Sequence, residues 1–275
     1  SVWGILIIPD ASGSVKQTRL MNDELFTRSF LSLLKRSQKI MVSTGAGISV
    51  ESGAPTFRST EGLWKDFKPE NYATPEAFAE DPKKVWEFYE WRRQKYKDMQ
   101  PNPGHHALAD LEKMFPDVCL FTQNVDGLHQ KAGSKNVYEL HGSIWRAKCI
   151  REEKVFPFLE TPLKELPPFC ECGALLRPDV VWFGEALPAH LIELAMQKAS
   201  LCEVFFIIGT SATVQPAASL AWIAYENGAI VVEINPEETQ ATDIANESFR
   251  GGAGIILPLM VEALRKHNEE NSSAH

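Results

Sequence analysis

Four short apolar segments without polar alternation constrain the fold of this chain most strongly. They are residues 39–44 (KIMVST), 118–123 (VCLFTQ), 204–209 (VFFIIG) and 229–235 (AIVVEIN). Runs of this kind are typical of parallel strands covered by helices on both faces. Amphipathic stretches that precede three of the strands predict helices at residues 104–115, 187–201 and 216–227. The sequence therefore predicts an α/β fold with a Rossmann-like, doubly wound parallel sheet.

Two segments interrupt this alternation of strands and helices and predict a smaller inserted lobe. Residues 54–103 hold aromatic-rich helical pieces, including residues 83–97, and residues 146–178 hold four prolines and a cysteine cluster. The expected Rossmann lobe comprises residues 22–53, 104–145 and 179–265. One catalytic unit of residues 22–265 fits the length of 275 residues.

Both ends of the chain lie outside this pattern. The run Val2–Pro9 is about eight residues long, too short for a membrane span, and no basic segment precedes it, as a signal peptide requires. We hypothesise that Met21 is at or near the natural start and that residues 1–21 are an extension outside the fold. Residues 266–275 are a polar tail that we expect to fray.

A first helix is expected directly after Met21. Asn22 or Asp23 is its predicted N-cap, and Lys35 and Arg36 mark its end. Its apolar face would contain Leu25, Phe26, Phe30, Leu33 and Leu34.

Charge and cysteine content exclude several classes of function. There are 28 basic and 36 acidic residues, for a net charge of −8, and no long basic run, which argues against a nucleic-acid partner. The five cysteines are an odd number in a chain of this size, which favours a reduced compartment over a disulfide framework. We expect a cytoplasmic protein with no membrane or nucleic-acid partner. Nothing in the sequence fixes the oligomeric state, and we expect a monomer.

A glycine turn follows the first strand, where dinucleotide folds place their phosphate loop. Gly45, Ala46 and Gly47 would bring the backbone close to a pyrophosphate. The third glycine of the usual G-x-G-x-x-G is absent, because Val50 stands in its place, and no acidic residue closes an obvious second strand. An ordinary dehydrogenase is therefore disfavoured, and a turn that merely packs remains the alternative.

Polar residues follow the second strand, and a histidine follows soon after. Gln123, Asn124 and Asp126 would lie at the carboxyl edge of the sheet, where open α/β sheets bind ligands. The alternative for Asn124 and Asp126 is a pair of Asx-turns. His141 has an ordinary pKa of about 6.5, so a neutral ring could accept a proton at pH 7. The alternative for His141 is a histidine that caps a turn.

Five motifs and one asparagine, in a fixed order over roughly residues 22–265, resemble the bacterial-type sirtuins, NAD-dependent protein lysine deacylases. They are GAGISVESGAPTFR (45–58), TQNVDGLH (122–129), ELHGS (139–143), RPDVVWFGE (177–185), GTSATVQPA (209–217) and Asn235. The resemblance implies a Rossmann lobe and a small lobe with a helical part and a zinc-ribbon part. NAD and acylated-lysine proteins or peptides would meet between the lobes.

The resemblance also implies roles for individual residues. His141 matches the family's base. Asn124, also matched as catalytic, and Asp126 match the residues that hold the nicotinamide amide and ribose, with Gln123 beside them. The NAD loop would comprise Gly45, Ala46, Gly47, Phe57 and Arg58, and the adenosine and phosphate side Gly209, Thr210, Ser211 and Asn235. The peptide would pair with the backbone near residues 180–185, including Val181, Trp182 and Phe183.

The resemblance is to class III, the desuccinylase- and demalonylase-like branch. Thr56 stands where many sirtuins have Asp, a departure that this branch shares. Tyr89 and Arg92, three residues apart on one helical face, match a pair that binds an acyl carboxylate, and Ala77 matches a small residue that widens the pocket. The alternative is an amphipathic helix whose Trp86, Tyr89 and Arg93 line the lobe interface. Arg93 is also within helical reach of Tyr89, so spacing alone does not choose between the arginines.

The cysteine cluster is one ligand short of a structural zinc site. Cys149 would pair with position 152, which is Glu152, and the second pair is Cys170 and Cys172. Glu152, Glu153 or water could complete a three-thiolate site. The alternative is a lobe without zinc that is held by its aromatic residues.

The sequence thus predicts an NAD-dependent deacylase that prefers succinyl, malonyl or glutaryl groups, with weaker deacetylation. Its products would be free lysine, nicotinamide and 2′-O-acyl-ADP-ribose. Two alternatives are a non-catalytic NAD or ADP-ribose binding module and a protein ADP-ribosyltransferase.

Overall fold

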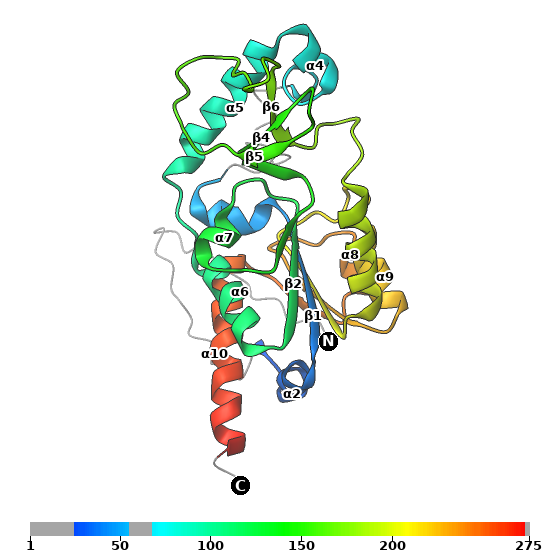
Figure 1. Ribbon diagram of the computed structural model, residues 1–275. Helices are drawn as coiled ribbons and strands as arrows, with labels where there is room; N and C mark the ends of the chain where they lie inside the picture. Colours follow the sequence, from blue (N-terminus) through cyan, green and yellow to red (C-terminus); the bar gives the residue numbers. More distant parts are fainter. Residues whose placement is uncertain (1–24, 55–67, 273–275) are drawn as a thin grey trace, which may run out of the picture.

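A computed structural model shows two lobes, and it describes residues 25–54 and 68–272 (Figure 1). The larger lobe is built on a six-stranded sheet in the order β3-β2-β1-β7-β8-β9, and every pairing in it is parallel. Its strands are β1 (Lys39–Thr44), β2 (Asp117–Thr122), β3 (Val137–Glu139), β7 (Val204–Ile208), β8 (Ile230–Ile234) and β9 (Glu247–Phe249). The predicted Rossmann-like sheet is confirmed.

The strand order reverses between β1 and β7, so their carboxyl ends form the switch point of the sheet. Thr44 pairs with Thr122 on one side and with Ile208 on the other. Loops leaving β1 and β7 therefore diverge from the same edge. Ligands bind at such points in open α/β sheets.

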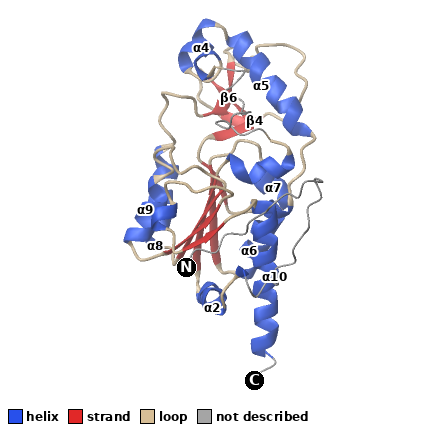
Figure 2. Ribbon diagram, turned by 180° about the vertical axis from the view of Figure 1, so that it is seen from behind, coloured by secondary structure: helices blue, strands red, loops and turns tan. Residues whose placement is uncertain are grey.

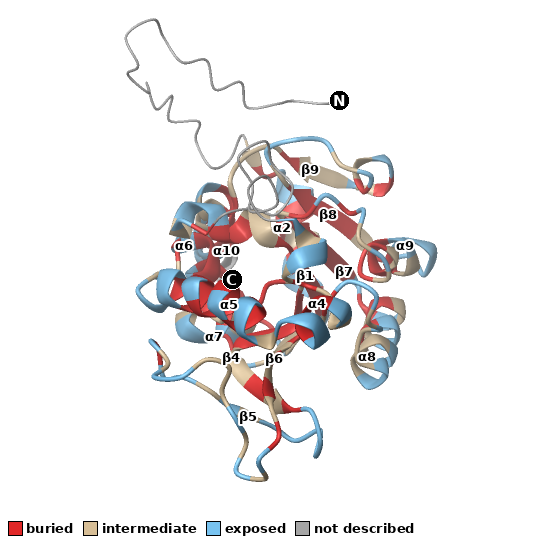
Figure 3. Cartoon of the chain, turned by 90° about the horizontal axis from the view of Figure 1, so that it is seen from above, coloured by how far each residue is buried: buried red, intermediate tan, exposed pale blue. Residues whose placement is uncertain are grey.

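Helices cover both faces of the sheet (Figure 2). One face carries α2 (Arg28–Arg36), α6 (Pro103–Met114) and α10 (Ala253–Ser272), with the short α7 (Leu128–Ala132) beside α6, and the other carries α8 (Ala189–Leu201) and α9 (Ser219–Glu226). The strands show no polar alternation because successive side chains enter two different cores. On β7, Phe206 packs with the α6 and α10 side and Phe205 with the α8 and α9 side. Figure 3 shows this buried sheet between its helical layers.

In the described part of the smaller lobe, two α-helices pack with a three-stranded antiparallel sheet of order β5-β4-β6. Its elements are α4 (Pro75–Glu80), α5 (Pro82–Lys97), β4 (Gly142–Cys149), β5 (Val155–Pro157) and β6 (Leu176–Val180). Strand β4 begins at Gly142, so the second insertion starts a few residues earlier than the predicted residue 146. The indole N–H of Trp86 on α5 donates to the Leu176 carbonyl at 2.7 Å, which joins helix and sheet.

The described residues also form three short 3₁₀ helices: η1 (Ala46–Ser52), η2 (Pro69–Asn71) and η3 (Thr242–Ile244). Among residues 25–54 and 68–272, no helix is long and apolar enough to cross a membrane.

The ends of the chain depart from the prediction. Helix α2 begins at Arg28 with Thr27 as its N-cap, so Leu25 and Phe26 precede this helix instead of lying on its face. Phe26 is buried all the same, against Phe249. Helix α10 continues to Ser272, beyond the point where the tail was expected to fray. The predicted caps Asn22 and Asp23 and the extension 1–21 lie outside the described residues.

Candidate active site

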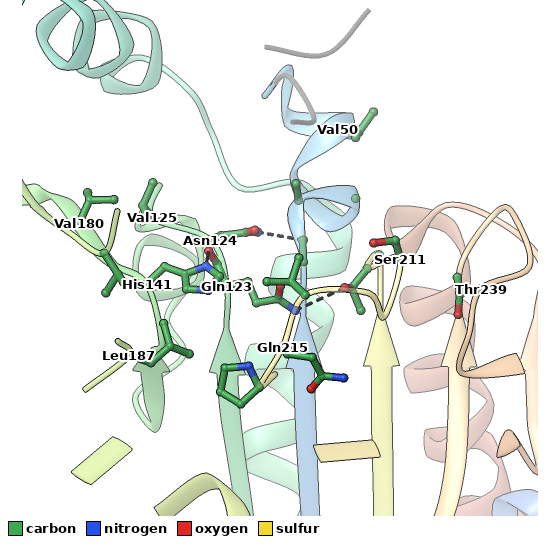
Figure 4. A pocket seen from close by; sticks show the side chains of 18 of the residues that line it. Val50, Gln123, Asn124, Val125, His141, Val180, Leu187, Ser211, Gln215 and Thr239 are labelled. Atoms are coloured by element: carbon green, nitrogen blue, oxygen red, sulfur yellow. Dashed lines mark hydrogen bonds between the residues drawn. The ribbon is translucent and has the colours of Figure 1, made fainter. Parts of the chain in front are cut away.

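A cavity of about 1090 Å³ opens at the carboxyl ends of β1 and β7 and extends towards the smaller lobe. Its volume lies just above the range of about 300–1,000 Å³ that is usual for ligand sites. Figure 4 shows Gln123, Asn124 and His141 on one side of this cavity and Ser211 and Thr239 on the other. Most of the predicted site residues line it: Gly45, Ala46, Gly47, Tyr89, Arg92, Gln123, Asn124, His141, Val181, Trp182, Phe183, Gly209, Thr210, Ser211 and Asn235.

The glycine turn packs closely against the loop that follows β7. A Cβ at Gly47 would lie 2.6 Å from Gly209 Cα, and one at Gly45 would lie 2.7 Å from the Gly209 carbonyl oxygen. The Gly47 N–H donates to that oxygen at 2.8 Å. Gly209 has a φ of 59°, which favours glycine. Packing of two loops therefore accounts for these glycines, and the Gly47 N–H is not directed at a ligand.

His141 follows β3, and its ring is held by the backbone of Gln123. Its Nδ1 lies 2.9 Å from the Gln123 carbonyl oxygen. Because a carbonyl oxygen only accepts, Nδ1 carries the proton and Nε2 has the lone pair. Burial lowers the pKa of His141 below its ordinary value. The ring is therefore neutral at pH 7, with an acceptor nitrogen in a residue that lines the cavity.

Asn124 and Asp126 are both buried, and the hydroxyl of Ser49 hydrogen-bonds to both side chains. The Asn124 side-chain N–H₂ donates to the Gly45 carbonyl at 3.0 Å and to Ser49 Oγ at 3.2 Å. Ser49 Oγ donates to Asp126 Oδ2 at 2.8 Å, and Asp126 Oδ1 accepts from the Leu128 N–H. Burial raises the pKa of Asp126. Asn124 faces the cavity, whereas Asp126 is not among its lining residues.

On the other side of the cavity, polar side chains converge on the loop after β7. Gln123 Nε2 donates to Thr210 Oγ1 at 3.3 Å, and Asn235 Nδ2 donates to the Thr210 carbonyl at 2.9 Å. Ser211 Oγ lies 2.8 Å from Thr213 Oγ1. Residues that directly follow β2, β7 and β8 thus meet at one edge of the sheet.

The helix α5 sends two buried polar side chains to the cavity. Tyr89 is 1% and Arg92 is 3% exposed, and both line the wall. The Trp182 indole N–H donates to the Tyr89 hydroxyl at 2.9 Å. Arg92 Nη2 donates to the Tyr96 hydroxyl at 3.4 Å, and its guanidinium carbon lies 5.6 Å from the centroid of the Tyr89 ring. Burial raises the pKa of Tyr89, so the phenol stays protonated.

Arg93, the other arginine within reach of Tyr89 by spacing, has different partners. Its Nη1 pairs with Glu90 at 3.0 Å, and its Nη2 donates to the carbonyl of Glu160, 2.8 Å away, and to that of Phe158. Arg93 is fully buried and is not among the residues that line the cavity. It joins α5 to the loop at residues 158–163.

Other predicted residues stand apart from the cavity or outside the described residues. Ala77 is buried in the small-lobe core and does not line the cavity. Phe57, Arg58 and Thr56 lie outside the described residues. In the predicted peptide segment, the Val181 N–H donates to the His141 carbonyl at 3.0 Å, and the Phe183 N–H to Ala73 at 2.9 Å.

Sequence reasoning assigned no role to two further features of the site. One is Ser49, whose place within the GAGIS segment could have drawn attention to it. The other is the pair Arg177 and Glu185, 2.6 Å apart, in which the arginine stacks 3.5 Å from the centroid of Trp182. Their spacing of eight residues carries no signal, because the chain folds back between β6 and the following turn.

The cysteine cluster is in the smaller lobe. The ligand atoms of Cys149, Glu152, Cys170 and Cys172 all lie within 4.8 Å of one another. Cys149 Sγ and Cys172 Sγ are 3.6 Å apart, close to the separation of about 3.8 Å that two thiolates have on a tetrahedral zinc ion. The Glu152 N–H donates to Cys149 Sγ and lowers the pKa of that thiol. These four residues could therefore bind zinc.

The remaining two cysteines have no part in this cluster. Cys119 on β2 and Cys202 after α8 are buried in the Rossmann lobe. Burial raises the pKa of each thiol to about 12, so both stay protonated.

Comparisons with known proteins agree with this geometry. The family model "Sir2 family" matches residues 45–216. The chain is 52% identical to NAD-dependent protein deacylase 2 of Pyrobaculum aerophilum, covering 85% of this chain and 94% of that protein. It is 53% identical to an NAD-dependent protein deacylase of Aquifex aeolicus, covering 82% and 95%.

Solved structures of Sir2 proteins also resemble this chain. A crystal structure of a Sir2 homolog–NAD complex superposes with a TM-score of 0.82 at 46% identity, covering 86% of this chain and 93% of that one. Sir2Af2 bound to a myristoylated histone peptide superposes with a TM-score of 0.71 at 34% identity, covering 91% and 100%.

Proposed function

The chain belongs to the Sir2 family and is an NAD-dependent protein deacylase, and on this premise we propose that it prefers lysines bearing succinyl, malonyl or glutaryl groups. Deacetylation would be weaker. Sir2Af2 binds a myristoylated histone peptide, which supports acylated proteins or peptides as substrates of this chain.

One observation carries the acyl preference: a phenol and a guanidinium converge on the cavity from successive turns of α5. Tyr89 and Arg92 are both buried and both line the wall, whereas Arg93 is engaged with Glu90 outside the cavity. A buried guanidinium gives a carboxylate strong, charge-assisted hydrogen bonds. An acetyl group has no carboxylate with which to bind this guanidinium. A neutral fatty chain, such as the myristoyl group bound by Sir2Af2, would place apolar groups against the buried guanidinium of Arg92 and could not hydrogen-bond to it.

We propose that His141 is the catalytic base. NAD would be consumed as a co-substrate: the bond between its ribose carbon and nicotinamide would break, and the acyl oxygen of the substrate lysine would form a bond to the same carbon. The neutral ring, with its proton held on Nδ1 by Gln123, would take a ribose hydroxyl proton at Nε2. The 2′-hydroxyl oxygen would then attack the acyl carbon, the C–N bond to the lysine would break with a proton going to the amine, and water would supply the oxygen that completes 2′-O-acyl-ADP-ribose.

We propose that the remaining lining residues hold the cofactor. Asn124 would orient the nicotinamide end from the carboxyl end of β2, with Gln123 beside it. The polar group around Thr210 and Asn235, together with Gly209 and Ser211, would hold the phosphates and adenosine. Neither Asp126 nor Ser49 lines the cavity, so Asp126 would act through Ser49 on Asn124, whose side-chain N–H₂ donates to Ser49 Oγ.

We propose that zinc, where bound, is structural, with Glu152 as the fourth ligand beside Cys149, Cys170 and Cys172. It would fix the ends of β4 and β6, since Cys149 ends β4 and the other two cysteines precede β6. No step of the reaction requires it.

We also propose a monomeric, cytoplasmic protein. Two lone buried thiols and a thiol cluster suit a reducing compartment. Light scattering on the purified protein tests the monomer.

Mass spectrometry of one peptide sequence carrying succinyl, acetyl or myristoyl lysine, with and without NAD, tests the function. We expect succinyl removal to be fastest, to require NAD and to be lost in His141→Ala. NAD consumption without deacylation would indicate an ADP-ribosyltransferase. NAD binding without consumption would indicate a binding module, and myristoyl removal faster than succinyl removal would contradict the acyl preference.

A further inference from the structure

A single carboxylate joins two walls of the cofactor cavity. Glu51, near the end of η1, accepts a hydrogen bond on Oε2 from the Gly254 N–H at 2.8 Å. The two residues are 203 positions apart in the chain. Glu51 and the segment at residues 251–253 both line the cavity.

The segment around α10 leaves space for this carboxylate. A Cβ at Gly252 would lie 2.3 Å from Glu51 Oε1, and one at Gly254 would lie 2.8 Å from Oε2. Neither glycine has a φ in the left-handed region. Space for Glu51, and not backbone conformation, is therefore what favours glycine at both positions.

Glu51 accepts from the Gly254 N–H, which has no acceptor within α10. Gly254 is the second residue of α10, and N–H groups in the first turn have no carbonyl one turn earlier. The partial positive charge of a helix N-terminus also favours a carboxylate there. Glu51 thus caps α10 from another part of the chain.

The two elements that Glu51 joins belong to different parts of the proposed NAD site. Helix η1 begins at Ala46, in the glycine turn of the cofactor loop. Residues 251–253 stand beside Asn235, whose backbone N–H donates to Phe249 and whose carbonyl accepts from the Gly251 N–H at 3.4 Å. Asn235 belongs to the proposed adenosine side.

We propose that Glu51 is a positioning residue for NAD, which holds η1 against the start of α10 and so sets the shape of the adenosine end of the cavity. It acts through the backbone and touches no reacting atom. This inference rests on the NAD dependence of the family and not on the acyl preference.

Steady-state kinetics on Glu51→Ala and Glu51→Gln test this role. We expect the KM for NAD to rise about three- to tenfold in Glu51→Ala, as the loss of one exposed charged cap implies. The kcat and the KM for acyl peptide should stay within about twofold of the wild-type values, because the residues proposed to bind the acyl group are on α5 in the smaller lobe. The KM for NAD of Glu51→Gln, which keeps an acceptor oxygen, should lie between the values of the wild type and Glu51→Ala. The exposed Glu193 on α8 does not line the cavity, so Glu193→Ala is the matched control.

Gly254→Ala is a second variant, which keeps the Glu51 side chain, and together with Glu51→Ala it forms a double-mutant cycle. Alanine is a better helix former than glycine, so this variant should fold, but its Cβ displaces the carboxylate. We expect Gly254→Ala to raise the KM for NAD in the wild type and to have no further effect in Glu51→Ala. Three results would each overturn the proposal. The first is an unchanged KM for NAD with only a lower Tm, and the second is an equal rise in the KM for NAD and the KM for acyl peptide. The third is additive effects of the two substitutions on the KM for NAD.

Discussion

Trp182 donates its indole N–H to the hydroxyl of Tyr89 at 2.9 Å. Because this bond uses a lone pair of the phenol oxygen, the Tyr89 proton is left to donate elsewhere. Trp182 is itself fixed, since Arg177 stacks on its ring and Glu185 accepts from its backbone N–H at 2.8 Å. Tyr89 is thereby oriented as a hydrogen-bond donor in the wall of the proposed acyl pocket.

Trp182→Phe removes the N–H and keeps an aromatic ring beside Arg177. We expect the ratio of desuccinylation to deacetylation, each measured as kcat/KM, to fall about three- to tenfold, because the phenol is no longer oriented. Tyr89→Phe should produce a similar fall. In a Tyr89→Phe background, Trp182→Phe should change the ratio no further, and a full additional loss there would contradict this coupling.

Arg93→Met should destabilise the protein without changing its acyl preference. Loss of Arg93 leaves Glu90 buried without its cation, which typically costs about 3–5 kcal/mol. Urea unfolding measures that free energy. At a temperature where the variant is folded, the ratio of desuccinylation to deacetylation should equal that of the wild type. A changed ratio with unchanged stability would reverse the roles of Arg92 and Arg93.

The sequence could not separate these two arginines, because both lie within helical reach of Tyr89. The distinction depends on the loop at residues 158–163, which brings the carbonyls of Phe158 and Glu160 over one face of α5. A contact between residues about 65 positions apart leaves no periodic signal. The same is true of Glu51 and Gly254.

Two buried histidines should make stability depend on pH. His105 and His129 have ring centroids 4.9 Å apart, and burial lowers both pKa values, that of His105 to about 4. Between the ordinary pKa of about 6.5 and the folded one, the unfolded chain binds protons that the folded chain excludes. The free energy of unfolding therefore falls as the pH drops from about 6.5 towards 4.

His105→Gln isolates one of the two contributions, because the raised pKa of the nearby Asp126 acts in the opposite direction. We expect the slope of unfolding free energy against pH to be shallower in this variant by up to about 1.4 kcal/mol per pH unit. Urea unfolding at several pH values between 4.5 and 7 measures it. Equal slopes in the variant and the wild type would show that His105 does not exclude the proton.

Glu152 should matter for zinc, whereas its neighbour should not. We expect elemental analysis to find about one zinc per chain and chelation to lower the Tm. Glu152→Ala should weaken zinc affinity by about tenfold or more. Glu153, which is exposed and pairs with Lys148 at 3.7 Å, gives the matched control Glu153→Ala. Absence of zinc from the wild type, or equal effects of both variants, would contradict the proposed ligand set.

The sheet was the most predictable part of the molecule, because burial on both faces leaves uninterrupted apolar runs. The predicted strand at residues 39–44 matches β1, and the other three differ from β2, β7 and β8 by a residue at one or both ends. The start of α2 was not predictable in this way, since Phe26 is buried as helix residues are, yet it precedes the helix. Periodicity cannot separate a buried residue in a helix from one just outside it.

The glycine turn shows a second limit of sequence reasoning. Its position after β1 predicted a phosphate loop and left packing open as the alternative. Gly45 and Gly47 are in fact needed for the approach of the loop after β7, and that loop also lines the cavity. A sequence gives the place of such glycines but not which neighbour requires them.

The kcat/KM of Arg92→Met on succinyl- and acetyl-lysine versions of one peptide tests whether Arg92 binds the acyl carboxylate. A charged hydrogen bond contributes about 1.5–3 kcal/mol, so we expect desuccinylation to fall about ten- to a hundredfold. Deacetylation should barely fall, because an acetyl group makes no such bond. Equal losses on both substrates would contradict the account.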